Sequence, residues 1–225
     1  MIPKKGMIKA TDGFERIVHW WLAVTCIILI ISGLGMMFQS FNFLGTPVGG
    51  LKNLKLVHNF TGLLFIPALF FAILIWWREA GIFKFPEDLE WIKVAGGYLW
   101  HVDKVPETHK YNPGQKMFFL AVAIFGILMV ISGLIMWFPL SVPRGLVQWM
   151  YPLHALGMLV IFPFVLVHIY LGTIGVPGSA PAIFTGYVTR AWAEKQCPGW
   201  LREMEDEGKL EVYGEEKPAV EHGQH

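Results

Sequence analysis

The sequence predicts an all-α membrane protein built as a bundle of four transmembrane helices. Hydrophobic residues make up 54% of the 225 residues, and the mean hydropathy is +0.49. Several runs reach the ~20 apolar residues that a helix needs to cross a bilayer, and each is bounded by glycine, proline or charge. The expected spans are Ile17 to Phe38, Leu54 to Trp77, Lys116 to Phe138 and Pro152 to Val176.

These four spans form one small bundle, so we expect a single transmembrane domain over residues 1–176. Basic residues precede the first span as in a secretory signal, but that span is long and no small-residue cleavage site follows it, so it should stay attached. Residues 177–225 then form a C-terminal extension. Its tail, EMEDEGKLEVYGEEKPAVEHGQH, is highly charged and poor in large apolar groups, which predicts partial disorder.

The distribution of lysine and arginine predicts the orientation of the bundle, because cytoplasmic segments retain positive charge. Basic residues are concentrated before the first span, between the second and third spans, and in the tail. The first and third connections contain only Lys52, Lys55 and Arg144. Both termini should therefore be cytoplasmic. Tryptophans near the span ends fit aromatic belts at the two interfaces; they are Trp20, Trp21, Trp76, Trp77, Trp137 and Trp149.

Four histidines fall inside the expected spans, where polar rings are costly. With both termini inside, His58 and His154 lie near the outer face, and His19 and His168 lie near the cytoplasmic face. A rise of ~1.5 Å and a turn of ~100° per residue place His154 and His168 roughly 21 Å apart and within ~40° of one helix face. The histidines therefore form two pairs, each at one depth.

Two imidazoles at matched depth are what axial ligation of a haem iron requires. We expect an outer haem on His58 and His154 and an inner haem on His19 and His168. The alternative is that each ring only hydrogen-bonds a neighbouring helix, and two matched pairs make this the minority interpretation. With two cysteines in all, the chain has no CxxCH motif and no iron-sulfur ligand set, so both haems should be b-type.

A weak internal repeat relates the two halves of the bundle. ISGLGMMF at residues 31–38 resembles ISGLIMWF at residues 131–138, and His58 and His154 are each followed nine residues later by proline. The pattern suggests two helix hairpins related by an axis along the membrane normal, with His58 equivalent to His154. Chance similarity between apolar segments is an alternative of nearly equal weight.

The inner pair departs from this repeat, since the equivalent of His19 is Phe119 and that of His168 is Ala72. Small residues in the spans either make room for porphyrin edges or, as is commoner in membranes, let helices pack closely. They are Gly33, Gly62, Gly133 and Gly157.

A quinone site needs polar groups near the inner haem, and HKYNPGQKM at residues 109–117 is the best candidate. Asn112 and Gln115 could hydrogen-bond a quinone carbonyl, and Gly114 allows close approach of the backbone. Taken alone, the segment is better explained as an Asn-Pro-Gly turn in which Asn112 caps a helix. Arg16 and Lys55, close in sequence to His19 and His58, are candidate partners of the haem propionates.

The chain has no nucleotide-binding loop, dinucleotide fingerprint or nucleophile elbow. Any oxidation of a fuel should therefore take place on another subunit, and no nucleic-acid partner is expected.

Several segments together resemble the cytochrome b, or gamma, subunit of membrane-bound respiratory formate dehydrogenases. They are FERIVHWW, LVHNFTG, KYNPGQK, HALG, VHIYLG and GYVTRAWAEK, and the similarity covers roughly Gly13 to Trp200. Hydrogenase and thiosulfate-reductase cytochromes b share the four-helix plan, and KYNPGQK is the segment that favours formate dehydrogenase. The resemblance implies the same two histidine pairs as ligands. It also implies a menaquinone site beside the inner haem at Asn112 and Gly114, although Pro113 stands where the family pattern has a small residue such as alanine.

The resemblance further implies a place in anaerobic respiration at the bacterial cytoplasmic (inner) membrane. An outward-facing molybdenum or tungsten catalytic (alpha) subunit would oxidise formate, and an iron-sulfur (beta) subunit would pass electrons to the outer haem. The inner haem would then reduce menaquinone or a related quinone with cytoplasmic protons, and the family suggests a trimer of such heterotrimers. Two alternatives stay open: a hydrogenase or another molybdenum oxidoreductase as donor, and a haem-free membrane anchor.

Overall fold

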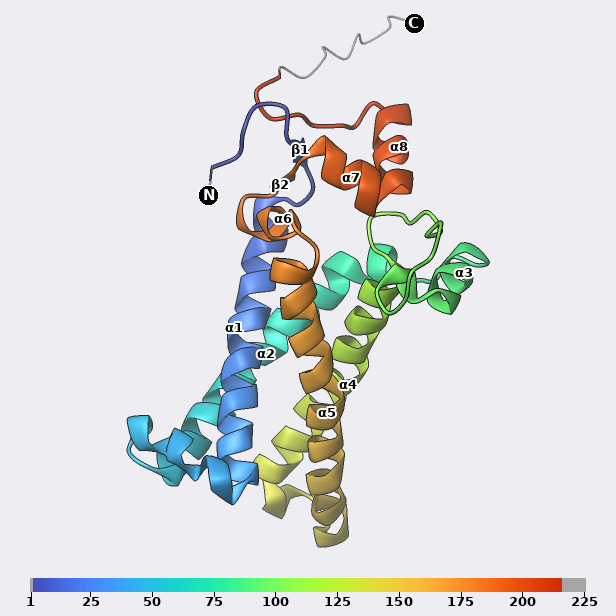
Figure 1. Ribbon diagram of the computed structural model, residues 1–225. Coiled ribbons are helices and arrows are strands. Elements are labelled where there is room, and N and C mark those ends of the chain that lie inside the picture. Colours follow the sequence, from blue (N-terminus) through green and yellow to red (C-terminus); the bar gives the residue numbers. More distant parts are fainter. Residues whose placement is uncertain (1, 216–225) are drawn as a thin grey trace, which may run out of the picture. The chain divides into compact units, whose positions relative to one another are not determined.

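A computed structural model describes residues 2–215 of the chain. Its long helices are α1 (Gly13–Met37), α2 (Leu51–Ala80), α4 (Pro113–Trp137) and α5 (Arg144–Tyr170), seen in Figure 1. All four are long and apolar enough to cross a membrane, and a π-helical turn, Leu171–Gly175, continues α5. The predicted all-α fold with four membrane-spanning helices is confirmed.

The start of the fourth span differs from the prediction. The rule that proline bounds a helix predicts Pro152 as its first residue, but α5 begins at Arg144 and contains both Pro152 and Pro163. Helix α2 likewise contains Pro67. Proline is tolerated inside membrane helices because neighbouring groups and local widening of the helix satisfy the carbonyl that loses its donor. Proline is therefore a poor boundary signal inside the apolar spans of this chain.

The chain folds as two units. The first, called here the bundle unit, comprises Ile17–Phe83 and Gly114–Tyr170. Phe65 and Leu69 of α2 and Val122 of α4 are buried at its centre, where apolar side chains of α1 pack against them. Short 3₁₀ helices follow α1 and α4; they are η1 (Gln39–Val48) and η3 (Pro139–Ser141).

The second unit, called here the terminal unit, comprises Met1–Arg16, Lys84–Pro113 and Leu171–His225. Strand β1 (Ile8–Lys9) pairs antiparallel with β2 (Tyr187–Val188), so segments from near the two ends of the chain meet in one small sheet. The short helices of this unit are α3 (Glu87–Lys93), η2 (Ala95–Gly97), α6 (Ala180–Phe184), α7 (Arg190–Gln196) and α8 (Pro198–Asp206). Its buried core consists of Ile8, Val188, Ala193, Cys197, Trp200 and Leu201.

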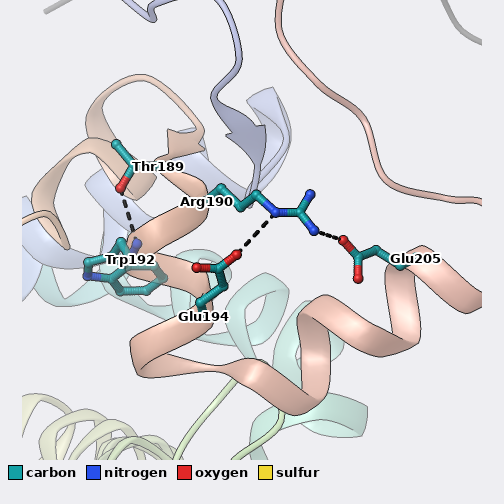
Figure 2. Close-up of polar contacts among 5 residues, drawn as sticks. All are labelled: Thr189, Arg190, Trp192, Glu194 and Glu205. Atoms are coloured by element: carbon teal, nitrogen blue, oxygen red, sulfur yellow. Dashed lines mark hydrogen bonds and ion pairs between the residues drawn. The ribbon is translucent and has the colours of Figure 1, made fainter.

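Polar contacts define the helices of the terminal unit (Figure 2). Thr189 caps α7, since its hydroxyl oxygen accepts a hydrogen bond of 3.2 Å from the backbone nitrogen of Trp192. Arg190 pairs with Glu194 one turn along α7 and with Glu205 of α8, which links the two helices. These side chains are largely exposed, so the ion pairs add little stability and chiefly orient α8.

The C-terminal extension predicted from residue 177 onward belongs to the terminal unit. Between residues 177 and 215 it contains α6, β2, α7 and α8. The tail for which the sequence predicts partial disorder runs on through residues 216–225, which lie outside the described residues.

Gly186 joins the N-terminal segment to the turn before β2. Its φ is +91°, and a Cβ built there would lie 2.8 Å from the Thr11 carbonyl oxygen and would overlap Nη1 of Arg16. That Arg16 nitrogen donates a hydrogen bond to the Thr185 carbonyl oxygen. Only glycine fits this conformation and this spacing.

We expect Gly186→Ala to lower the melting temperature of the purified protein, because the new methyl group displaces Arg16 and strains the backbone. Gly208→Ala is the matched control: its φ is +63° and nothing lies within 4 Å of the place that a Cβ would take, so only the backbone cost of ~1 kcal/mol applies. Tryptophan fluorescence during heating measures both variants. Equal melting temperatures would contradict a steric role for Gly186.

Candidate functional site

The bundle unit brings the intramembrane histidines together in two pairs. His58 of α2 faces His154 of α5, with ring centroids 6.2 Å apart and ring planes at 63°. His19 of α1 faces His168 of α5, with centroids 6.1 Å apart and planes at 45°. These are the pairs that matched depth predicts from the sequence.

Two buried serines hold the rings of the outer pair. The Oγ of Ser32, on α1, lies 2.8 Å from Nδ1 of His58. The Oγ of Ser132, on α4, lies 2.9 Å from Nδ1 of His154. Each outer ring is therefore fixed by a hydroxyl from a neighbouring helix.

Two glycines lie against the same rings. A Cβ on Gly33 would be 3.6 Å from Cε1 of His58, and one on Gly133 would be 3.3 Å from Cε1 of His154. An apolar cavity between the two histidines is lined by all four long helices. Gly62 borders this cavity, and a Cβ added to it would meet nothing within 4 Å. Gly157 instead packs against Met129, 2.5 Å from such a Cβ, so it serves helix packing.

The inner pair has a different environment. Nδ1 of His19 is buried and has no hydrogen-bond partner among the described residues. The His168 ring stacks on Phe118 of α4, with centroids 4.3 Å apart and planes at 15°. One imidazole nitrogen of this pair is thus left unsatisfied by residues 2–215.

Comparison with known proteins identifies the family. A family model described as prokaryotic cytochrome b561 matches residues 10–186. The chain belongs to the prokaryotic cytochrome b561 family. It is 33% identical over 193 residues to the formate dehydrogenase cytochrome b556(fdo) subunit of Escherichia coli, covering 84% of this chain and 90% of that one.

Two other relatives have similar names. The nitrate-inducible formate dehydrogenase cytochrome b556(Fdn) subunit of Escherichia coli is 27% identical over 208 residues, covering 90% of this chain and 94% of the relative. The formate dehydrogenase cytochrome b556 subunit of Haemophilus influenzae is 32% identical over 198 residues, covering 84% and 79%. The chain is thus a multi-pass membrane cytochrome b, and it binds haem b.

The histidine pairs fit the haem iron that a cytochrome b561 carries. A metal–imidazole bond is ~2 Å long and a ring nitrogen lies ~1.1 Å from the ring centre, so two axial imidazoles have centroids ~6.2 Å apart. The observed separations are 6.2 and 6.1 Å. Among residues 2–215, no group of three or more His, Cys, Asp or Glu side chains gathers that could hold a bare metal ion. Two ligands on opposite sides suit an iron whose other four positions are filled by a porphyrin.

The predicted quinone residues lie at the start of α4. Gly114 and Gln115 are in its first turn, one turn before the Phe118 ring that stacks on His168. Asn112 directly precedes the helix, and its side chain forms a hydrogen bond with the Tyr98 hydroxyl. Burial raises the pKa of Tyr98, and this hydrogen bond lowers it in part. The segment before Asn112 is anchored in the terminal unit, where Thr108 bonds Gln196 and Gly199.

The two candidate propionate partners lie in different settings. Lys55 is exposed on α2, one turn before His58. Arg16 is in the first turns of α1 and donates to the Thr185 carbonyl oxygen. Their contact with propionates stays a prediction.

The sequence interpretation missed Ser32, Ser132 and Phe118. The signal for the serines was present, because both lie in the repeated ISGL segment at equivalent positions. Small residues in membrane helices usually serve packing, and a serine beside a glycine is readily assigned the same role. Phe118 had no such signal, as one aromatic residue in an apolar span is unremarkable in sequence.

Proposed function

We propose that the chain binds two b haems, an outer one between His58 and His154 and an inner one between His19 and His168. The observation that carries this proposal is the ring separation of 6.2 and 6.1 Å in the two pairs. Nδ1 of His19, which has no hydrogen-bond partner among the described residues, does not bond a neighbouring helix. A histidine that only bonded a neighbouring helix would have its buried nitrogens satisfied. At ~6 Å between centroids, two facing rings are also too far apart for a direct hydrogen bond, which argues against a haem-free anchor.

We further propose that the chain is the membrane subunit of a respiratory formate dehydrogenase in the bacterial cytoplasmic membrane, with both termini cytoplasmic. The names of its relatives and the distribution of basic residues support this assignment. Bound haems would supply one-electron carriers at two depths roughly 20 Å apart. The four histidines hold them there, and the apolar bundle excludes water between the two levels. Formate oxidation belongs to a molybdenum or tungsten subunit, and an iron-sulfur subunit would deliver its electrons at the outer face.

Quinone, with menaquinone as the expected type, would react at Asn112, Gly114 and Gln115. Amide side chains can donate hydrogen bonds to a quinone carbonyl, and the flexible Gly114 lets the ring approach the backbone. The stack of Phe118 on His168 supports this location, because Gly114 precedes Phe118 by one turn of α4. Protons would come from the cytoplasm, so each electron moved inward stores ~2.3 kcal/mol per 100 mV of potential.

Haem content tests the first proposal. The intact complex should contain two b haems per chain, and His58→Ala, His154→Ala, His19→Ala or His168→Ala should each leave one. His101→Ala is the matched control, because that histidine is almost fully exposed. This variant should keep both haems bound. Pyridine haemochrome assays against protein concentration give the count. One haem or none in the intact wild-type complex would refute the pairing.

Quinone reactivity tests the second site. Asn112→Leu removes a hydrogen bond worth ~0.5 to 1.5 kcal/mol, so reoxidation of formate-reduced haems by a menaquinone analogue should slow roughly 3- to 10-fold. Reduction of both haems by formate should be unchanged. Tyr98→Phe removes the partner of Asn112 but keeps the amide, and it should reoxidise at the wild-type rate. Wild-type kinetics in Asn112→Leu would move the quinone site elsewhere.

A further inference from the structure

Each serine of the outer pair bonds both a histidine and the backbone of its own helix. Ser32 Oγ lies 2.6 Å from the Ile28 carbonyl oxygen as well as 2.8 Å from Nδ1 of His58. Ser132 Oγ lies 2.7 Å from the Leu128 carbonyl oxygen and 2.9 Å from Nδ1 of His154. Their side chains are buried, at 2% and 0% exposure, so bulk water does not compete for either group.

The number of protons fixes the direction of these bonds. A serine hydroxyl has one proton, and the helix carbonyl can only accept, so the hydroxyl proton is donated to the carbonyl four residues earlier. The serine oxygen is then left to accept a proton from the histidine. His58 and His154 are therefore held with hydrogen on Nδ1, which leaves the lone pair of Nε2 available to an iron.

The inner pair has no equivalent arrangement at His19. Its Nδ1 is buried without a partner among the described residues, although the same helix, α1, provides Ser32 for His58. The two proposed haems are thus bound by the same ligand type in unequal surroundings.

We propose that Ser32 and Ser132 are positioning residues that fix the outer ligands and lower the midpoint potential of the outer haem relative to the inner one. This inference rests on the proposed two-haem function. A hydrogen-bond acceptor on Nδ1–H makes the imidazole a stronger electron donor, which stabilises ferric over ferrous iron. Because Ser32 and Ser132 each bond one outer histidine, this effect would act twice on the outer haem. Electrons entering at the outer level would then be driven inward.

Redox titration of the intact complex tests the proposal, with the outer signal identified as the one lost in His58→Ala. Ser32→Ala and Ser132→Ala should each raise the outer midpoint, decreasing the outer-to-inner equilibrium constant roughly 3-fold for the weakened hydrogen bond. A 3-fold change corresponds to ~28 mV, since tenfold is 59 mV for one electron. The Ser132→Ala shift should be the smaller, because His154 also has a backbone hydrogen bond with Met129. The two shifts should add in the double variant, while the inner midpoint stays constant.

Two further variants separate a redox role from a packing role. Thr25→Ala is the matched control, because Thr25 is buried on the same helix and donates 2.8 Å to the Trp21 carbonyl oxygen, with no bond to a histidine among the described residues. It should leave both midpoints unchanged. Ser32→Thr keeps the hydroxyl and should restore the wild-type outer midpoint.

The possible results distinguish the role of the serines from the two-haem function. Two bound haems with an unmoved outer midpoint in both alanine variants would overturn the role of the serines and leave the two-haem function standing. Fewer than two haems in the wild-type complex would overturn the two-haem function itself. Because the two serines lie on different helices, failure of one variant to assemble leaves the other as the test.

Discussion

An imidazole buried in an apolar bundle is costly unless its ring nitrogens are paired, and this cost organises the outer level of the bundle unit. Moving a polar group from water into hydrocarbon without a hydrogen-bond partner costs ~2 to 7 kcal/mol. At the outer level a serine satisfies Nδ1 of each histidine, and the facing rings lie at a spacing suited to iron. At the inner level Nδ1 of His19 has no protein partner among the described residues. An iron bound to Nε2 would not supply that partner, so the two levels hold their ligands differently.

The weak internal repeat that the sequence suggests would explain why the outer level is symmetric and the inner level is not. In this repeat Ser32 and Ser132, like His58 and His154, occupy equivalent positions of two helix hairpins, so the same serine–histidine contact occurs twice. At the inner level the repeat equivalent of His19 is Phe119, which packs against Trp77 with ring centroids 6.4 Å apart. The inner pair comes from α1 and α5, and Phe118 of α4 stacks on its His168.

The spans and the histidine pairing could be predicted because both follow from one-dimensional signals. Apolar length gives the helices, and basic residues give an orientation that converts position into depth. The start of α5 could not be predicted, because a proline such as Pro152 usually bounds a helix in water but is tolerated inside a helix of a packed membrane bundle. The terminal unit was also beyond reach, because its sheet pairs Ile8 with Val188 across most of the chain. The hydrogen bond between each serine and its histidine depends on how the helices are rotated about their own axes. The apolar composition of the spans does not specify that rotation.

Two histidine pairs, each proposed to hold one haem, are the basis of the proposed electron path. An experimental structure of the intact complex, at a resolution that shows porphyrin planes, tests this arrangement most directly. We predict one macrocycle between His58 and His154 and a second between His19 and His168, with irons roughly 20 Å apart along the bundle. A single macrocycle, or any haem ligated by one histidine from each pair, would contradict it.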